Sequence, residues 1–495
     1  MKMTNTNHSK QIERAMLALQ KQKKTIEKAH YRLNYHFMAP AGWLNDPNGL
    51  IQHNGLYHLF YQHHPYNADW GPMHWGHAVS SDLIEWQHKP AALAPSEVYD
   101  HEEANEDIGC FSGSAVSCRE ELVLIYTGHI SGRTPKEVQA AAVSQDGIHF
   151  EKKNKNPIIS EPPSGLSEDF RDPKVWKYND TWYVVIGSSI NGNGAVSLFQ
   201  SNDLDTWEYR GIALEGDGTQ GDMWECPDLF PLGEKHALVL SPMNMENGKN
   251  IVMIGDMDYS TGKFLPESQK EIDDGLDFYA AQTFQDEKGR WILIAWMDTW
   301  ETDFPTKAEG WAGAMTIPRE VVLDEQNKVK LLPVRELENL RGNQQQFSDV
   351  ALNAGESFDL NGDGELAHSY EIKVDIKINE NKGKAGLHLR ASSDGQEKTL
   401  VYYDMETNEL VVDSTASGGA TQPNISKTEV VVQDTISLRL FMDTCSLEVC
   451  TGDGGAWITN RIYPEPVNTG MQIYTENTNV MVEEVNVWSL KKVIE

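Results

Sequence analysis

Short apolar segments recur along the first two-thirds of the chain at nearly constant spacing. They begin near residues 56, 122, 182, 236 and 291, and each is a run of aliphatic and aromatic residues with the length of a buried strand. The intervals of 54 to 66 residues suit one four-stranded β-sheet with its loops, and repetition of such a sheet is typical of a β-propeller. Five repeats therefore predict a five-bladed β-propeller over residues 33–335.

A second pattern lies between the apolar runs. Residues 81–86, 144–150 and 201–207 each contain a serine, an aspartate at a turn and an aromatic residue. Aspartate suits a turn because its side chain can hydrogen-bond the main chain two residues on. Radial repetition of short sheets leaves only protected edges, which favours a propeller. The alternative is a β-sandwich or barrel in which short strands happen to be evenly spaced.

The pattern of apolar and turn residues changes after residue 345. Gly, Asp and Asn turns separate segments in which apolar and polar residues alternate, such as residues 369–374, 400–403 and 435–441. Alternation with a period of two is typical of strands that bury one face, and such strands predict a β-sandwich over residues 347–495. The fold class is therefore all-β, and residues 336–346 are predicted to form a short helical linker.

Residues 1–32 differ from the rest because their apolar residues lie at roughly helical spacing among Lys, Gln and Glu. These apolar residues are Ile12, Met16, Leu19 and Ile26. The pattern predicts an amphipathic helical arm. The segment lacks the apolar core of a secretory signal, and the chain has no run of about 18 apolar residues that could span a membrane.

Cysteine usage and charge indicate the compartment and the partners. The five cysteines are an odd number without a CxxC pair, which predicts reduced thiols in a cytoplasm. The 42 Lys and Arg residues against 74 Asp and Glu residues give a net charge of −32, which disfavours nucleic acid and anionic membranes as partners. We expect a small-molecule partner and no cofactor, in a protein that is either a monomer or a homodimer.

Three carboxylates precede apolar runs by about ten residues. They are found in Asn45-Asp46-Pro47-Asn48-Gly49, Arg171-Asp172-Pro173 and Glu225-Cys226-Pro227. Each motif taken alone could be an ordinary turn or a chance match of a few residues. Turns alone, however, do not require an acid at a similar place in three repeats. If the repeats pack around an axis, the three acids converge. The sequence therefore predicts a cluster of carboxylates in the middle of the propeller.

Two carboxyl groups on either side of a bond are the requirement for glycoside hydrolysis. One must be ionised while the other holds a proton, and different surroundings achieve this. Asp46 lies in a polar turn that suits an anion, which makes it the expected nucleophile. Glu225 lies between Trp224 and Cys226-Pro227, an apolar setting that favours a protonated general acid. Asp172 follows Arg171, whose charge is expected to keep this third carboxylate ionised.

The combination of motifs resembles glycoside hydrolase family 32, which includes invertases, sucrose-6-phosphate hydrolases, levanases and inulinases. The resemblance extends over nearly the whole chain from residue 33. It is carried by Trp43-Leu44-Asn45-Asp46-Pro47-Asn48-Gly49, Phe111-Ser112-Gly113-Ser114, Phe170-Arg171-Asp172-Pro173 and Trp224-Glu225-Cys226-Pro227-Asp228. It implies a five-bladed propeller followed by a β-sandwich, a retaining mechanism and no metal. It also implies the same roles for Asp46, Asp172 and Glu225.

By position, the resemblance also assigns a set of residues to a fructosyl pocket. These are Asn45, Gln62, Trp70, Phe111, Ser112, Arg171, Tyr279 and Trp300. Aromatic faces suit the C–H groups of a sugar, whereas amides and hydroxyls bind its hydroxyl groups. Gln62 could instead be a hydrogen-bonding residue within a blade, and Trp300 could be a packing residue. A histidine-rich stretch from His58 to His77 lacks carboxylates at metal-ligand spacing, so we expect no metal.

The sequence thus predicts a retaining β-fructofuranosidase. Its expected reaction is release of the terminal β-fructofuranosyl unit from sucrose and short fructo-oligosaccharides through a covalent fructosyl-enzyme. One alternative is a sucrose-6-phosphate hydrolase, which a cytoplasmic location favours, whereas the acidic composition favours the neutral sugar. A second alternative is a sugar-binding propeller without catalysis, which the presence of all three acids disfavours.

Overall fold

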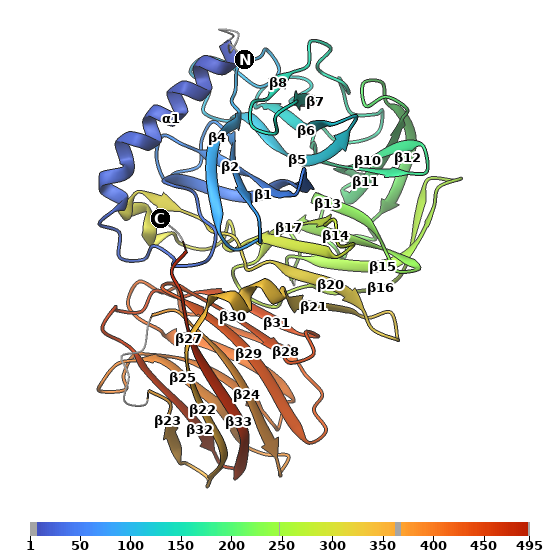
Figure 1. The fold of residues 1–495 in the computed structure, drawn as a ribbon. Helices are drawn as coiled ribbons and strands as arrows, with labels where there is room; N and C mark the ends of the chain where they lie inside the picture. Colours follow the sequence, from blue (N-terminus) through green and yellow to red (C-terminus); the bar gives the residue numbers. More distant parts are fainter. Residues whose placement is uncertain (1–6, 247, 362–367, 494–495) are drawn as a thin grey trace.

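A computed structural model describes residues 7–246, 248–361 and 368–493. Two β-rich bodies follow each other along the chain (Figure 1). The first is a ring of five sheets, coloured blue to yellow, and the second is a pair of packed sheets, coloured orange to red. This confirms the predicted all-β fold with a five-bladed propeller and a C-terminal sandwich. The exact domain boundaries near residues 32, 335 and 346 stay predictions.

Each blade of the propeller is an antiparallel sheet whose strands follow each other in the sequence, except that β19 and η1 interrupt the fifth. Blades one and two comprise β1 (Gly42–His53), β2 (Leu56–His64), β3 (His74–Ser80) and β4 (Trp86–Leu93), then β5 (Ile108–Cys118), β6 (Glu121–Ile130), β7 (Glu137–Ser144) and β8 (Glu151–Lys152). Blades three and four comprise β9 (Phe170–Tyr178), β10 (Thr181–Ile190), β11 (Asn193–Ser201) and β12 (Glu208–Glu215), then β13 (Met223–Leu232), β14 (Lys235–Met243), β15 (Ile251–Asp258) and β16 (Lys263–Glu271). Blade five comprises β17 (Tyr279–Gln285), β18 (Trp291–Trp296), β20 (Arg319–Leu323) and β21 (Val329–Pro333).

The ring closes between the last blade and the first. The first strand of each blade contacts the first strands of both neighbouring blades, and β17 contacts β1. The short strand β19 (Trp311–Ala312) also pairs in parallel with the start of β1, joining Gly42 to Trp311. The apolar runs that begin near residues 56, 122, 182, 236 and 291 are the second strands of the blades. Each second strand therefore supports an inner strand that faces the axis of the ring.

The repeated Ser–Asp–aromatic pattern forms the turn between the third and fourth strands of blades one to three, as the sequence predicts. Asp82 Oδ1 accepts hydrogen bonds from the main-chain N–H groups of Ile84 and Glu85, both at 2.9 Å. Asp146 and Asp203 accept equivalent pairs of bonds in the next two blades. Each aspartate thus satisfies two main-chain donors that would otherwise lie unpaired at the turn.

The five inner strands share an irregularity near their beginnings. The register shifts between Leu44 and Pro47, Phe111 and Gly113, Arg171 and Lys174, Glu225 and Asp228, and Tyr279 and Gln282. Such bulges add residues on one strand and redirect its side chains. Three bulge residues other than glycine have left-handed backbone angles, namely Asp172 (φ 65°), Cys226 (φ 50°) and Ala280 (φ 54°). These bulges carry the predicted site residues.

The second body consists of two six-stranded sheets with an aliphatic core between them. One sheet contains β22 (Arg341–Leu352), β33 (Val480–Leu490), β24 (Tyr370–Ile378), β29 (Thr435–Asp443), β30 (Ser446–Thr451) and β31 (Trp457–Arg461). The other contains β23 (Ser357–Asp359), β32 (Gly470–Glu476), β25 (Lys384–Ala391), β26 (Lys398–Asp404), β27 (Glu409–Ala416) and β28 (Ile425–Glu429). A 3-10 helix, η2 (Arg335–Leu340), joins the two bodies, and β22 begins directly after it.

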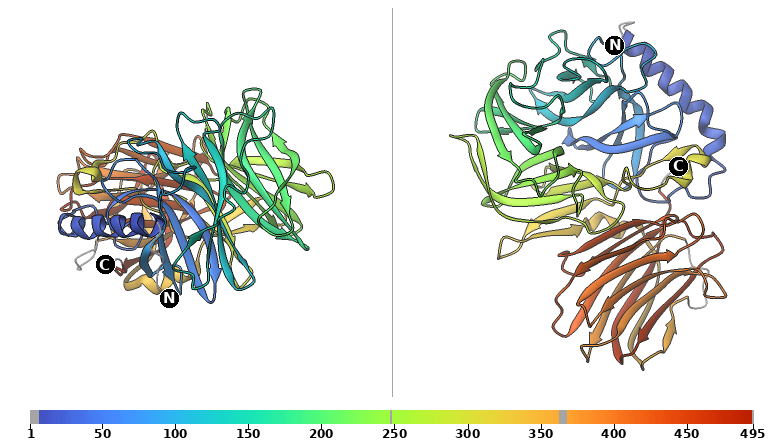
Figure 2. Two further views of the ribbon diagram at one scale, coloured as in Figure 1. Left: turned by 90° about the horizontal axis from the view of Figure 1, so that it is seen from above. Right: turned by 180° about the vertical axis from the view of Figure 1, so that it is seen from behind.

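An N-terminal helix, α1 (Asn7–Ile26), lies along the outside of the propeller (Figures 1 and 2). It packs against β4 and buries His8 and Ala15. The His8 ring accepts a hydrogen bond from the N–H of Ala94 at 3.2 Å, and the Gln22 amide donates to the carbonyl of Pro65 at 2.7 Å. In the part of the chain that the structure describes, no helix is long and apolar enough to cross a membrane.

A buried group of charges joins the propeller to the sandwich. His36 Nδ1 lies 2.9 Å from Asp443, and His36 Nε2 lies 2.8 Å from Glu448. Arg319 of the fifth blade also contacts Glu448, at 2.5 Å, and Asp273, at 2.8 Å. Burial alone would lower the pKa of His36, but the two carboxylates overcome this and raise it to about 8. His36 is therefore an imidazolium ion that donates to both carboxylates.

This arrangement predicts that the protein loses stability in mildly alkaline solution. The folded-state pKa of His36 lies above its unfolded value. The part of the free energy of unfolding that comes from charged His36 is therefore complete below about pH 6.5, and it is lost as the pH rises through about 8. This part amounts to about 2 kcal/mol. The free energy of unfolding should therefore fall between pH 6.5 and 9 in urea titrations, and His36→Gln should flatten this dependence. His149→Gln, at an exposed histidine, is the control. An unchanged pH dependence in His36→Gln would contradict the account.

Candidate active site

The three predicted acids lie on inner strands β1, β9 and β13, near the middle of the propeller (Figure 1). Cys226 shows how close two of them are. Its thiol sulfur lies 3.9 Å from Asp46 Oδ2 and 3.6 Å from Asp172 Oδ2. Its main-chain N–H also donates to Asp172 Oδ2 at 2.8 Å. Since Glu225 is the neighbouring residue on the same bulge, the three carboxylates converge as the sequence predicts.

The acids do not occupy one equivalent position in their blades. Arg171 pairs with Gly187 just before the bulge of β9, and Glu225 pairs with Ser241 just before the bulge of β13. Glu225 therefore corresponds to Arg171 rather than to Asp172, and Cys226 corresponds to Asp172. In β1, Leu44 pairs with His63 just before the bulge, so Asn45 corresponds to Asp172 and Asp46 lies one residue further on. The expectation that all three acids share one position in the repeat is therefore wrong, because they occupy three successive positions. The three acids still converge because the bulges redirect their side chains.

Asp46 is partly exposed and held by two donors. Asn45 Nδ2 donates to Asp46 Oδ1 at 2.9 Å, and Ser112 Oγ donates to Asp46 Oδ2 at 2.5 Å. The Trp43 indole N–H donates to Asn45 Oδ1 at 2.8 Å, which fixes the orientation of the amide. Burial raises the pKa of Asp46 to about 6, helped by the charge of Glu225 and opposed by the two donors. At neutral pH, Asp46 is thus an oriented anion with little solvation, which favours a nucleophilic role.

Asp172 is buried, and its surroundings differ from those predicted. Burial and the charges of Glu225 and Asp46 raise its pKa, against the opposing charge of Arg171. The Arg171 side chain forms its ion pairs with Glu137, Asp169 and Glu225. The charge of Arg171 does lower the pKa of Asp172, as expected, but burial and the two other acids outweigh this effect. These opposing contributions come from tertiary packing, so the next residue in sequence is an incomplete guide to the charge of Asp172.

Glu225 has a polar environment, although its sequence neighbours are apolar. Its Oε1 accepts from Arg171 Nε at 3.0 Å and from Arg171 Nη2 at 2.9 Å. Its Oε2 accepts from the Tyr279 hydroxyl at 2.7 Å. Trp224 is fully buried in the apolar core and does not surround the carboxyl group. The expected apolar setting is thus wrong, but the Glu225 side chain keeps 17 % of its surface exposed and can reach a ligand.

The remaining predicted pocket residues fall into two groups. Asn45, Ser112, Arg171 and Tyr279 hydrogen-bond directly to the acids. The aromatic residues and Gln62 are further out. Trp70 meets Phe111 edge to face at 6.1 Å, and Trp300, 49 % exposed, stacks 5.8 Å from Trp43. Gln62 is buried and donates to the carbonyl of Cys110 at 2.9 Å, which joins blade one to blade two.

Several residues that contact the site were not predicted from the sequence. Cys226 contacts two of the acids, whereas its sequence motif indicates only that it neighbours Glu225. Thr127 accepts a hydrogen bond from the N–H of Asp172 at 3.1 Å. Glu137 binds Arg171 from the opposite side to Glu225. Thr127 and Glu137 lie on β6 and β7, away from the bulged strands, so the repeat does not single them out.

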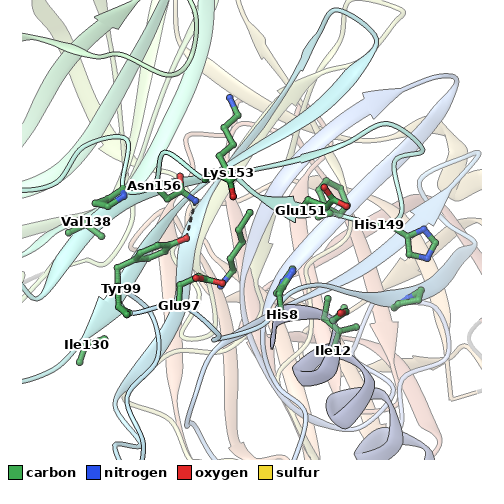
Figure 3. Close-up of a pocket in the computed structure, with 18 of the residues that line it drawn as sticks. His8, Ile12, Glu97, Tyr99, Ile130, Val138, His149, Glu151, Lys153 and Asn156 are labelled. Carbon is green, nitrogen blue, oxygen red and sulfur yellow. Dashed lines mark hydrogen bonds between the residues drawn. The ribbon is translucent and has the colours of Figure 1, made fainter. Parts of the chain in front are cut away.

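A separate cavity of about 1020 Å³ lies between α1 and the first two blades (Figure 3). His8 and Ile12 of the helix line one side, and Tyr99 and Asn156 line another, with the Asn156 amide donating to the Tyr99 hydroxyl at 2.9 Å. None of the three acids lines this cavity. Across residues 7–246, 248–361 and 368–493, no group of three or more His, Cys, Asp or Glu side chains is arranged to hold a metal ion.

Comparison with family models assigns both bodies of the molecule. The model of the glycosyl hydrolases family 32 N-terminal domain matches residues 36–333, and that of the family 32 C-terminal domain matches residues 336–489. The chain belongs to glycoside hydrolase family 32. The family 32 assignment confirms the predicted resemblance and identifies the chain as a hydrolase, which sets aside a sugar-binding propeller without catalysis.

Known members of family 32 resemble this chain over nearly its full length. A sucrose-6-phosphate hydrolase of Escherichia coli is 40 % identical over 478 residues, covering 92 % of this chain and 94 % of its own. A raffinose invertase of the same organism is 37 % identical with the same coverage. The solved structure of a family 32 β-fructofuranosidase from Bombyx mori is 35 % identical, covers 98 % of both chains and has a TM-score of 0.83.

The raised pKa of Asp46 predicts that this residue reduces the stability of the fold. An acid whose folded-state pKa is raised destabilises the protein as the pH increases from its unfolded value, near 4, through about 6. Asp46→Asn should therefore raise the free energy of unfolding at pH 8, by up to about 3 kcal/mol, and much less at pH 4. Urea titrations at the two pH values measure the difference.

The turn residue Asp203 provides a control of opposite sign. Main-chain N–H groups hold its pKa below the ordinary value, so Asp203→Asn should lower stability at pH 8. If Asp46→Asn destabilised the protein at pH 8 as Asp203→Asn does, the electrostatic account of the site would be wrong.

Proposed function

We propose that this family 32 enzyme releases the terminal β-fructofuranosyl unit of sucrose and short fructo-oligosaccharides with retention of configuration. The observation that carries the proposal is the convergence of Asp46 and Glu225 around Cys226, with unlike hydrogen-bond partners. Two carboxyl groups so arranged can act on opposite sides of one glycosidic bond. The proposed reaction has two steps that share a covalent fructosyl-enzyme.

Asp46 is the proposed nucleophile. Ser112 and Asn45 fix both of its oxygens, so the carboxylate meets the anomeric carbon in one orientation. In the first step, an Asp46 oxygen forms a bond to that carbon while the bond to the leaving glucose breaks. Glu225 donates its proton to the leaving oxygen, so the sugar departs as a neutral alcohol. Asp46 then carries the fructosyl group as an ester.

In the second step, Glu225 acts as a base. It takes a proton from a water molecule, whose oxygen attacks the anomeric carbon and restores free Asp46. Arg171 and Tyr279 hold the two Glu225 oxygens in place through both proton transfers. Asp172, held by the N–H of Cys226, is proposed to bind fructose hydroxyls and to stabilise positive charge at the anomeric carbon. Phe111, Trp70 and Trp300 provide apolar surfaces for the sugar rings.

A second candidate substrate is sucrose 6-phosphate, which the similarity to the Escherichia coli enzyme favours. A phosphate group needs a cation that is not already neutralised. Lys307, near Trp43, pairs with Asp69 at 3.0 Å, and Lys249, near the Trp300 loop, pairs with Glu301 at 3.4 Å. Because both lysines already have acidic partners, they favour the neutral sugar over its phosphate. The unpaired state of all five cysteines supports a reducing compartment, and we propose a cytoplasmic location.

The direct test is hydrolysis of sucrose and sucrose 6-phosphate by the purified protein. We expect kcat/KM to be at least about tenfold higher for sucrose, a difference of 1.4 kcal/mol in transition-state stabilisation. NMR during the first turnovers should detect β-fructofuranose before its anomers equilibrate. The Asp46→Asn protein is the control for background hydrolysis. A preference for the phosphorylated sugar would support the second candidate, and release of α-fructofuranose first would contradict retention.

A further inference from the structure

A chain of ionisable side chains, each close to the next, extends from the protein surface to Glu225. Asp107 lies 3.2 Å from His129 Nε2, and His129 Nδ1 lies 3.0 Å from Glu137. Glu137 in turn lies 3.1 Å from Arg171 Nη1, and Arg171 Nη2 lies 2.9 Å from Glu225. Asp107 is about half exposed, whereas the Glu137 side chain is only 1 % exposed. Neither Glu137 nor His129 is part of a catalytic motif recognised in the sequence.

The β6–β7 hairpin holds His129 and Glu137 opposite each other. The two residues are cross-strand partners at the end of this pair of strands. The other Glu137 oxygen accepts from the N–H of Phe170 at 2.5 Å, which ties the carboxylate to the main chain just before Arg171. Burial alone would raise the pKa of Glu137, but Arg171 and His129 overcome this and hold it below its ordinary value. Glu137 is therefore a fixed, buried anion.

Glu137 determines where the Arg171 guanidinium can lie. Arg171 Nη1 donates to Glu137 and, at 2.8 Å, to Asp169. Only the Nε and Nη2 edge then remains for Glu225, and both nitrogens donate to the same oxygen, Oε1. Glu225 Oε2 is left to Tyr279. A guanidinium held on two sides cannot follow Glu225 when that side chain changes its protonation state.

The second effect of Glu137 is electrostatic. Glu137 offsets the charge of Arg171, which would otherwise stabilise ionised Glu225 and hinder its protonation. Asp169 offsets it only in part, because Asp169 Oδ1 also pairs with Lys136 at 2.7 Å. Glu225 is faced by Arg171 and Asp172 from β9, Tyr279 from β17 and Asp46 from β1. Among these groups, Arg171 is the cation. Removing a negative charge next to Arg171 should therefore change the relative stability of the ionised and protonated forms of Glu225.

His129 links the same chain to the sugar pocket. Its ring stacks on Phe111, with centroids 4.0 Å apart and an angle of 7° between the planes. Phe111 meets Trp70 edge to face. His129 therefore contacts both Glu137, which binds Arg171, and Phe111, an aromatic residue of the proposed pocket. The same side chain thus helps to position both Glu225 and this pocket residue.

We propose that Glu137, anchored by His129, is a positioning residue for the proton transfers of Glu225. This inference rests on the proposed function. Glu137 holds Arg171 so that it orients Glu225, and it limits the positive charge that Glu225 experiences. A purely structural ion pair would affect stability without affecting the ionisation that controls turnover, so the pH profile distinguishes the two roles.

The test compares pH profiles of kcat/KM on sucrose for the wild type, Glu137→Gln and Glu137→Asp. Glu137→Gln keeps the shape but removes the charge, so Arg171 should stabilise ionised Glu225 more strongly. The alkaline limb, which is the fall of kcat/KM at high pH, should move to lower pH by about one unit. This is the size of shift that one nearby charge produces. At pH 8 this gives about a tenfold loss of kcat/KM. Glu137→Asp retains the charge and should keep the limb near its wild-type position.

Glu336→Gln, in η2 next to the fifth blade, is a matched control. Glu336 forms a two-point ion pair with Arg290, at 2.8 Å and 3.0 Å, away from the three acids. This substitution should lower stability without moving the limb. If Glu137→Gln does not fold, Asp169→Asn removes the other acidic partner of Arg171 Nη1 at a more exposed site, and its limb should move in the same direction.

The outcomes separate this inference from the proposed function. The positioning role would be overturned if the alkaline limb of Glu137→Gln stayed at its wild-type pH, or if the limb of Glu336→Gln shifted by an equal amount. Neither result would contradict fructose release. If Glu137→Asp shifted the limb as much as Glu137→Gln, charge on Arg171 would not be the cause, and the proposal would also fail. Absence of fructose release by the wild type on both substrates would overturn the proposed function itself, and the role of Glu137 with it.

Discussion

Bulges near the start of the five inner strands are the constraint on which the site depends. A regular strand would direct successive side chains to opposite faces, and the acids would not all reach the axis. The register shifts at residues 44–47, 171–174 and 225–228 bring Asp46, Asp172 and Glu225 to one place. Left-handed angles at Asp172 and Cys226 show that the backbone is strained there. The closed ring and its buried second strands support this geometry.

Close approach of three carboxyl groups raises the free energy of the folded protein, and the site contains features that limit this effect. Serine and asparagine donors bind Asp46, the main chain and thiol of Cys226 face Asp172, and Arg171 and Tyr279 bind Glu225. The pKa values of Asp46 and Asp172 are still raised, first by burial and also by the other carboxylates. Raised pKa values are common at catalytic sites, where reactivity takes precedence over stability.

The fold and the identity of the acids could be predicted because both depend on local, repeated signals. Apolar runs at regular intervals mark the second strands, and the serine–aspartate turns mark the outer ones. The surroundings of the acids could not be predicted in this way. Glu225 has Trp224 as a sequence neighbour but Arg171 and Tyr279 as spatial neighbours, from two other blades. Glu137 and His129 also contact the site through tertiary packing, which a single sequence does not display.

The central claim is that Asp46 forms a covalent bond to the fructosyl group. The most direct measurement uses Glu225→Gln and a fructoside with a very good leaving group, which needs little protonation in the first step. The second step should be slow in this variant, so the fructosyl-enzyme should accumulate. Peptide mass spectrometry after an acid quench should find one fructosyl residue on Asp46, and added azide should remove it. A fructosyl group on Asp172, or none on any residue after a burst of leaving group, would contradict the account.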